Sequence, residues 1–450
     1  MPAEATPRDN LMTTRSGSIA ASDPEGHGDG DWLQPVLAVV AAFGAYFCMY
    51  GLRKPFTAAT YADATVLGVG FKQALVISQV LGYTLSKFIG IRVVSEMPPR
   101  WRAAALAGLV LVAEAALVGF AVLPQPWNVG CLFINGLPLG MVFGLVLAPL
   151  EGRRVTELLT AGLCASFILA GGVMKSTGVW LLDRGISEAW MPATAGAIYL
   201  APLTLFTALL HLVKPPSSRD REARSERRPM NAADRRRFLA RYGGVVLAIV
   251  TVYVLTNVIR NIRDDFAPEI WQGLGVTAPP EVFTQTEFFV ALGVLAASGA
   301  AVLVRDNRRG FAFSLGVCLV GFLLLAIALV ARATGLVGGF PFMVMTGLGL
   351  YLPYVAIHTT VFERLLAMTR EPGTIGFLMY LADAFGYLAY VGVMLGGGIL
   401  ASRVDSLTIF VGSSWIAIAI SMVALGVTWR WRPAAPPSEP ARGLPAEPTR

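Results

Sequence analysis

The sequence predicts an all-α integral membrane protein whose twelve transmembrane helices form two pseudo-symmetric six-helix bundles. Of its 450 residues, 55% are hydrophobic and only 14% are charged, whereas a soluble domain carries roughly 25% charged residues. Apolar runs recur along the chain at the length of about 20 residues that a spanning helix needs. A polar, arginine-rich segment separates these runs into two sets of six. The excess of apolar residues therefore indicates a chain solvated by a lipid bilayer.

The apolar runs give the spans in order. We expect transmembrane helices at 33–57, 73–94, 102–123, 128–150, 156–182, 191–213, 243–264, 284–304, 309–332, 339–362, 373–401 and 406–429. Six of them precede the polar segment and six follow it. This arrangement is typical of transporters that are built from two related halves.

The polar segments divide the chain into five parts. Residues 1–32 lack the basic start and short apolar run of a signal peptide, so we interpret them as a disordered cytoplasmic tail. A bundle at 33–213 precedes an Arg-rich cytoplasmic linker at 214–241, and a second bundle at 242–432 follows it. The Pro-, Ala- and Glu-rich tail at 433–450 is predicted to be disordered.

Basic residues in the predicted loops indicate the orientation of the chain. One side carries the linker and most of the other loop arginines: Arg100, Arg102, Arg153, Arg154, Arg305, Arg308, Arg309, Arg364, Arg370, Arg430 and Arg432. The opposite side holds little besides Arg184 and Arg403. Because positive loops stay in the cytoplasm, we expect a multi-pass protein of the cell's inner (plasma) membrane with both termini cytoplasmic. Nucleic-acid binding is not expected, because no aromatic residues interleave with the charges.

Signatures of catalysis, metal binding and disulfide formation are missing from the sequence. The four cysteines, Cys48, Cys131, Cys164 and Cys318, lie inside apolar runs, so we interpret them as small core residues. There is no HExxH, no GxSxG and no Walker loop, which are the motifs of common hydrolases and nucleotide-binding enzymes. We therefore expect no enzyme activity, no cofactor and no metal site, in a chain that works as a monomer.

The first spans of the two halves share a Tyr–Arg spacing. Tyr46 stands seven residues before Arg53, and Tyr253 stands seven residues before Arg260. A pseudo-two-fold axis would make the two arginines face each other across a central cavity. Two guanidinium groups repel unless an anion lies between them, and arginine holds phosphate or carboxylate in a bidentate fork. We predict that both Tyr–Arg pairs bind an anionic substrate; the alternative for the arginines is capping of helix-end carbonyls.

Further ionisable residues fall inside the predicted spans, where a charge is costly and faces the bundle interior or a water-filled cavity. Lys87 and Lys175 add positive charge to the first half, and we assign both to the substrate site. Arg263, Asp264 and Asp265 stand near a span end, where snorkelling to the interface is the simpler interpretation.

Five residues are candidates for coupling or gating. Glu287 is expected to pair with Lys54 in a salt bridge that holds one conformation. Asp383 or Glu114 is the candidate site for a coupling proton. His358 is either a hydrogen-bonded core residue or a proton site, because histidine titrates near neutral pH.

Short motifs in both halves resemble those of the organophosphate:phosphate antiporters, a branch of the major facilitator superfamily. The matching segments are Arg53-Lys54-Pro55-Phe56, Gly82-Tyr83, Ser86-Lys87-Phe88, Pro99-Arg100, Arg260, Asp265-Phe266-Ala267-Pro268, Gly373-Thr374-Ile375-Gly376-Phe377 and Phe385-Gly386-Tyr387-Leu388. They touch most of the membrane portion. The resemblance implies the major facilitator fold, a phosphate clamp of Arg53 and Arg260 helped by Lys87, an inter-domain role for Lys54, and rocking of the halves around the site.

The sequence departs from that branch at three places. The superfamily's Gly-x-x-x-Asp-Arg loop is replaced by a stretch ending at Ser95-Glu96. The fifth-span histidine of the branch corresponds to Phe167 or Ile168, and Lys175 is a charge that the resemblance does not imply. The substrate is therefore predicted only as a small organic anion, possibly a phosphorylated metabolite.

Three functions follow from these observations. The first is a secondary active transporter of such an anion by alternating access, for which the resemblance suggests antiport. The second is a transporter-like membrane sensor, because members of the same family act as receptors that signal to a partner kinase. The third is a proton-coupled exporter of a small hydrophobic compound, which would use Asp383 or Glu114 and leave the arginines structural.

Overall fold

A computed structural model describes most of the predicted membrane portion. The described residues are 33–61, 64–66, 68–147, 156–213, 232–304, 306–369, 375–400 and 405–431. The predicted tails at 1–32 and 433–450, and the first part of the predicted linker, lie outside them. Within these ranges the regular secondary structure is helical except for one short hairpin, which confirms the all-α prediction.

The first half contains six long helices. They are α1 (Leu33–Met49), α2 (Phe71–Glu96), α3 (Pro99–Val122), α4 (Trp127–Leu147), α5 (Thr156–Asp183) and α6 (Met191–His211). Two 3₁₀ turns, η1 (Tyr50–Leu52) and η2 (Pro55–Ala58), continue the chain after α1. A two-stranded antiparallel hairpin, β1 (Thr65–Val66) and β2 (Val69–Gly70), leads into α2.

The second half begins with the longest helix. Its elements are α8 (Ala232–Asp265), α9 (Ala267–Gly273), α10 (Pro280–Val302), α11 (Asn307–Ala333), α12 (Gly339–Ala356), η3 (Ile357–Val361), α13 (Phe362–Thr369), α14 (Ile375–Leu400) and α15 (Ser406–Arg430). The segment η3 is a π-helical turn between α12 and α13. Residues 232–241, which were predicted to belong to the linker, form the first turns of α8. Hydropathy detects only the apolar part of a helix, so the predicted boundary came too late in the sequence.

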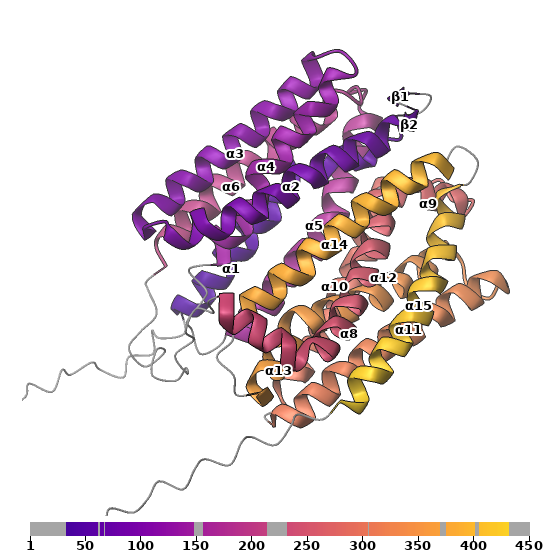
Figure 1. The fold of residues 1–450 in the computed structure, drawn as a ribbon. Coiled ribbons are helices and arrows are strands. Elements are labelled where there is room, and N and C mark those ends of the chain that lie inside the picture. Colours follow the sequence, from indigo (N-terminus) through magenta and orange to yellow (C-terminus); the bar gives the residue numbers. More distant parts are fainter. Residues whose placement is uncertain are drawn as a thin grey trace, which may run out of the picture.

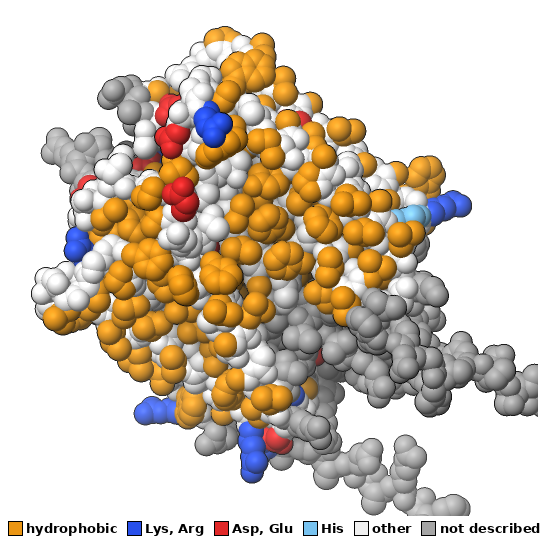
Figure 2. Space-filling model, turned by 180° about the vertical axis from the view of Figure 1, so that it is seen from behind, with side chains coloured by type: hydrophobic (Ala, Val, Ile, Leu, Met, Phe, Trp, Pro, Cys, Tyr) orange, Lys and Arg blue, Asp and Glu red, His pale blue; other side chains and the backbone are white. Residues whose placement is uncertain are grey.

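The described helices support a multi-pass membrane protein. Ten of them are long and apolar enough to cross a bilayer, and α1 with its 3₁₀ turn offers a shorter apolar helix at Val36–Leu52. The helix α2 is 26 residues long and is not among the ten. The count of twelve spans therefore stays a prediction. Figure 2 shows hydrophobic side chains over most of one face, with charged side chains toward its edges, as expected for a surface in lipid.

The helices form two groups that meet along a few helices. In Figure 1, α1–α6 lie together in indigo to magenta, and α8–α15 lie together in red to yellow. The contact between the groups is made mainly by α5 with α10 and by α2 with α14. The linker joins the end of α6 to the start of α8, so the other end of α8, which carries Asp265, lies away from the linker. The turns after α1, which carry Arg53 and Lys54, meet this end of α8. We call this the distal end.

Candidate functional site

Arg53 follows the 3₁₀ turn η1 and is buried among tyrosines. Its guanidinium carbon lies 4.0 Å from the ring centre of Tyr83 and 5.5 Å from that of Tyr50. Its Nη1 donates a long hydrogen bond of 3.4 Å to the Tyr50 hydroxyl, and its buried Nε has no hydrogen-bond partner. The arginine is therefore held mainly through the faces of aromatic rings, which attract a cation.

Arg260 has the same kind of environment in the second half. Its guanidinium carbon lies 4.3 Å from the ring centre of Tyr354 and 5.5 Å from that of Tyr351. One of its nitrogens donates to the side-chain oxygens of Asn257 and Asn261, at 2.9 and 3.1 Å, while its buried Nε is unpartnered. The predicted equivalence of the two arginines thus extends to their surroundings, which are aromatic and amide rather than acidic.

The two arginines differ from the cations around them. Five others each contact a carboxylate: Lys54, Lys72, Lys87, Lys175 and Arg263. Within the described part of the chain, no aspartate or glutamate forms a salt bridge with Arg53 or Arg260. Both side chains are only 6% exposed. A buried charge without a counter-ion is expensive, so the two arginines are candidates for binding an anion from outside the protein.

An ion-pair cluster joins the halves at the distal end. The Lys54 ammonium lies 2.5 Å from a carboxylate oxygen of Asp264 and 2.5 Å from one of Asp265. Lys175 forms an ion pair with the other oxygen of Asp264, and the Tyr390 hydroxyl donates to Asp265 at 2.8 Å. All five side chains are buried. The cluster therefore ties η1–η2 and α5 of the first half to α8 and α14 of the second.

A second inter-half pair lies beside this cluster. Lys72, in the first turn of α2, contacts Glu269 of α9 at 2.6 Å and donates to the Thr57 carbonyl at 2.8 Å. On α5 and α10, the Ser176 and Thr284 hydroxyls are 2.7 Å apart. The distal end is thus closed by polar contacts from several helices.

The predicted pairing of Lys54 with Glu287 was wrong. Glu287 pairs with Arg263 at 2.7 Å, and both belong to the second half. Lys54 finds Asp264 and Asp265 instead, because the end of α8 faces the 3₁₀ turns that follow α1. Arg263, Asp264 and Asp265 are 2–6% exposed, so the prediction that they snorkel was wrong as well.

Lys175 was assigned to the substrate site, and its ammonium is already paired. Besides Asp264, it reaches the Gly171 carbonyl at 3.2 Å one turn earlier in α5. Lys87 also has an anionic partner, Asp383 of α14. Neither lysine has the free charge that distinguishes the two arginines.

Asp383 is the centre of a third cluster, which the sequence did not reveal as one. It accepts from Lys87 of α2 and from the Tyr253 hydroxyl of α8. His358 of η3 lies with Nε2 3.6 Å from the carboxylate and 3.3 Å from the Tyr253 oxygen. Two residues predicted for coupling, Asp383 and His358, therefore meet two predicted for substrate binding, Lys87 and Tyr253.

The remaining predicted residues lie apart from this cluster. Tyr46 packs edge-on against Tyr50 and Phe143, with ring centres 5.4 and 5.3 Å away, so it supports the Arg53 side. Glu114 of α3 packs against Gly196 of α6, inside the first half. No contact between Glu114 and a central cation occurs in the described ranges.

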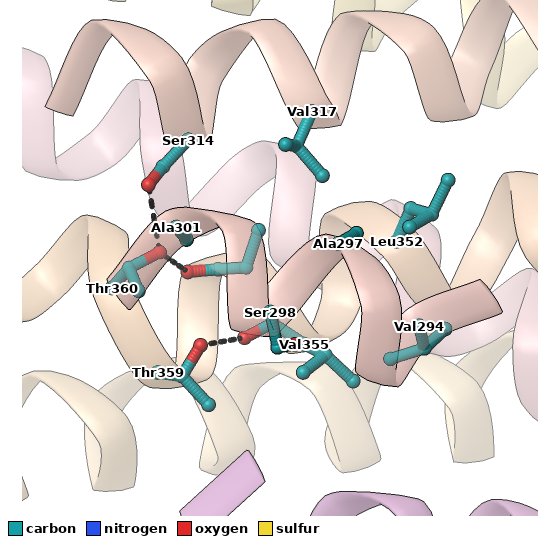
Figure 3. A pocket seen from close by; sticks show the side chains of 11 residues that line it. Val294, Ala297, Ser298, Ala301, Ser314, Val317, Leu352, Val355, Thr359 and Thr360 are labelled. Atoms are coloured by element: carbon teal, nitrogen blue, oxygen red, sulfur yellow. Dashed lines mark hydrogen bonds between the residues drawn. The ribbon is translucent and has the colours of Figure 1, made fainter. Parts of the chain in front are cut away.

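Two hollows in the described part of the chain bear on the site. One lies inside the second half between α10, α11 and the α12–η3 segment, as Figure 3 shows. Its hydroxyls are used internally: Thr360 bonds to Ser314 at 2.8 Å and to the Ala356 carbonyl at 3.0 Å, and Thr359 to the Val355 carbonyl at 2.9 Å. The other lies between α2 and α14 and is lined by Thr84, Lys87, Phe88, Tyr380, Ala384 and Tyr387. The second is lined by Lys87, which pairs with Asp383.

Sequence reasoning missed the tyrosines that hold the arginines. Tyr83, Tyr351 and Tyr354 supply the closest ring faces, and Tyr387 lies 5.3 Å from Tyr83 across the boundary between the halves. Aromatic residues are common in membrane spans, so their number gave no signal. Their contribution shows only when α2, α12 and α14 are placed around the arginines.

Comparisons with known proteins define the fold and the family. The structure matches that of a D-xylose-proton symporter with a TM-score of 0.58 at 16% identity, over 89% of this chain and 97% of that chain. This confirms the major-facilitator-like fold. The model of DUF5690, described as a family of unknown function, matches residues 55–431. No curated protein matches. The likeness to the organophosphate:phosphate branch is not supported by these comparisons and stays a prediction.

Proposed function

Because this chain belongs to the DUF5690 family of unknown function and has a major-facilitator-like fold, we propose that it is a secondary active transporter of a small organic anion. Arg53 and Arg260 bind the substrate, one from each half. The observation that carries the proposal is their lack of an acidic partner. Five neighbouring cations each have one.

The chemistry of the two arginines supports an anionic ligand. A guanidinium stacked on a tyrosine ring keeps its N–H edge available, and that edge matches carboxylate and phosphate in bidentate geometry. Tyrosine hydroxyls around the pair add neutral hydrogen-bond donors. The resemblance to the phosphate-ester antiporters favours a phosphorylated metabolite, with Lys87 as a third cation once Asp383 releases it.

The distal ion pairs support alternating access. They are the contacts that must break if the halves rock apart at that end, and Lys54, Asp264 and Asp265 stand at its centre. With α1 and α2 counted as spans, the chain crosses the membrane twelve times. Both termini then lie in the cytoplasm of a plasma-membrane protein, and the closed distal end faces outward.

Ligand-dependent stabilisation tests the anion assignment. Purified full-length protein is heated with inorganic phosphate, glycerol 3-phosphate, glucose 6-phosphate or citrate. A ligand at 100 times its Kd stabilises a protein by about 2.7 kcal/mol, so a binding anion raises the melting temperature. We expect this rise to disappear in Arg53→Ala and Arg260→Ala.

Arg184→Ala is the matched control. Arg184 also stacks on an aromatic ring, that of Trp180 at 4.6 Å, but it is exposed. This variant should keep the full response. A response that survives in the Arg53→Ala/Arg260→Ala double variant would remove the arginines from the site. Binding without flux in vesicles would favour the sensor function over transport.

A further inference from the structure

His358 stands at an unusual position in the backbone. It lies in the π-helical turn η3, between the ordinary helices α12 and α13. Such turns widen a helix by one residue and are frequent at functional sites. The imidazole is nearly buried, with 9% of its side chain exposed. It packs against the rings of Tyr253 and Tyr354, with centres 5.2 and 5.1 Å away.

The hydrogen-bond pattern around His358 fixes its neutral tautomer. The single Tyr253 hydroxyl hydrogen goes to Asp383. The hydrogen between Tyr253 and His358, whose atoms are 3.3 Å apart, must then come from Nε2. This leaves Nδ1 as a bare lone pair, and Nδ1 is buried without a hydrogen-bond partner. A buried acceptor without a donor is costly, so Nδ1 is a place where a proton fits.

The Tyr354 ring links His358 to Arg260, one of the two arginines of the proposed substrate site. The Tyr354 ring lies 4.3 Å from the Arg260 guanidinium and 5.1 Å from the His358 ring. Arg260 and a protonated His358 would repel each other across this ring. An anion on Arg260 removes that repulsion and adds attraction, so anion and proton each favour the binding of the other.

The charged and titratable groups around His358 are few. Those facing it are Tyr253 and Arg260 of α8, Tyr354 of α12, Asp383 of α14 and Lys87 of α2. From α5, the Phe167 ring packs on Tyr354, and the Cys164 thiol is buried. On the other side of η3, the contact with α11 is the Thr360–Ser314 hydroxyl pair, and Arg364 of α13 donates to Asn307.

We propose that His358 is the site of a coupling proton, so that this protein moves its anion together with a proton. This inference rests on the proposed function. A proton from water adds to Nδ1 when an anion is held by Arg260. The resulting imidazolium directs its Nε2–H to Asp383 and competes there with Lys87. Since Lys87–Asp383 joins α2 to α14, protonation loosens a contact between the halves.

Histidine NMR tests the proposal on the intact protein. The chain has three histidines, at 27, 211 and 358, so His358→Gln identifies the signal of His358 in the ¹⁵N-labelled full chain in nanodiscs. Spectra are recorded between pH 5 and 9 with and without glycerol 3-phosphate or citrate. We expect the anion to raise the protonated fraction of His358 and to leave His211, at the exposed end of α6, unchanged.

Affinity measurements give the reciprocal result. The probe should bind more tightly to the wild type as the pH falls, by a total factor of roughly 5 to 150, the usual range for two coupled sites. In His358→Gln the probe affinity should be nearly independent of pH. His211→Gln is the control and should behave as the wild type. In vesicles with a trapped pH indicator, probe uptake should acidify the lumen only when His358 is present.

The outcomes separate the two proposals. A probe that binds while His358 stays neutral at every pH overturns the proton site and leaves the anion transporter intact. A protonated fraction that is the same with and without a bound probe does so too. If no probe binds in the stabilisation experiment, the anion assignment fails and takes the coupling with it.

Discussion

At the residue scale, the central feature is a contrast between paired and unpaired buried cations. Lys54 and Arg263 have carboxylates at 2.5 and 2.7 Å, whereas Arg53 and Arg260 rest on tyrosine faces. A carboxylate partner offsets much of the cost of burying a cation, whereas aromatic rings offset only a part of it. Arginine is thus a structural link at Arg263, which pairs with Glu287, whereas Arg53 and Arg260 are the residues that we propose to bind an anion.

Tyr83 tests the contribution of the ring faces. Tyr83→Phe keeps a ring under the Arg53 guanidinium, while Tyr83→Leu removes it. A cation–π contact is worth about 0.5–2 kcal/mol, so anion affinity should fall roughly 2- to 30-fold in Tyr83→Leu and much less in Tyr83→Phe. Isothermal titration with the best-binding anion measures this. Equal losses in both variants would assign the effect to the hydroxyl rather than the ring.

At the element scale, close helix crossings place the site. The helices α2 and α4 approach so closely that a Cβ added at Gly82 would overlap the Phe133 carbonyl oxygen, and one at Gly136 would overlap that of Gln79. Small residues permit such approaches in membranes. The crossing fixes the rotation of α2, and with it the positions of Tyr83 toward Arg53 and of Lys87 toward Asp383.

Gly82→Ala should therefore destabilise the protein. Forcing extra atoms into a packed contact costs typically about 1–3 kcal/mol, because the obstacle here is rigid backbone. Thermal unfolding in detergent measures the change. Gly108→Ala in α3 is the control: a Cβ there meets no atom within 4 Å, so the melting temperature should stay the same or rise slightly. Equal melting temperatures for the two variants would contradict the crossing.

At the scale of the whole molecule, the sequence predicted the layout better than the contacts. Apolar runs were enough for the helices, and the family resemblance was enough for the major-facilitator-like fold. The Tyr–Arg spacing singled out Arg53 and Arg260, and their role in binding a substrate stays a prediction. They could not show that Lys54 reaches Asp264 rather than Glu287, since that depends on which helix ends meet across the halves. The π turn that carries His358 likewise has no hydropathy signature.

Rocking of the halves can be tested by a disulfide. Ser176 and Thr284 touch across the halves at 2.7 Å, so cysteines at both positions, in a variant without the four native cysteines, should form a disulfide that stops transport until it is reduced. Ser314 and Thr360 are equally close, at 2.8 Å, but both belong to the second half. Cross-linking that pair should leave transport active. Unimpaired transport with a complete Ser176–Thr284 cross-link would exclude rocking at the distal end.

The most direct test of the central claim is anion counterflow in proteoliposomes. Vesicles containing the full chain are preloaded with unlabelled anion, and the entry of the radiolabelled form is followed for phosphate, glycerol 3-phosphate, glucose 6-phosphate and citrate. The two unpaired arginines predict saturable counterflow of at least one anion that is lost in Arg53→Ala and Arg260→Ala and retained in Arg184→Ala. Full counterflow in both central arginine variants, or none for any anion in the wild type, would contradict it.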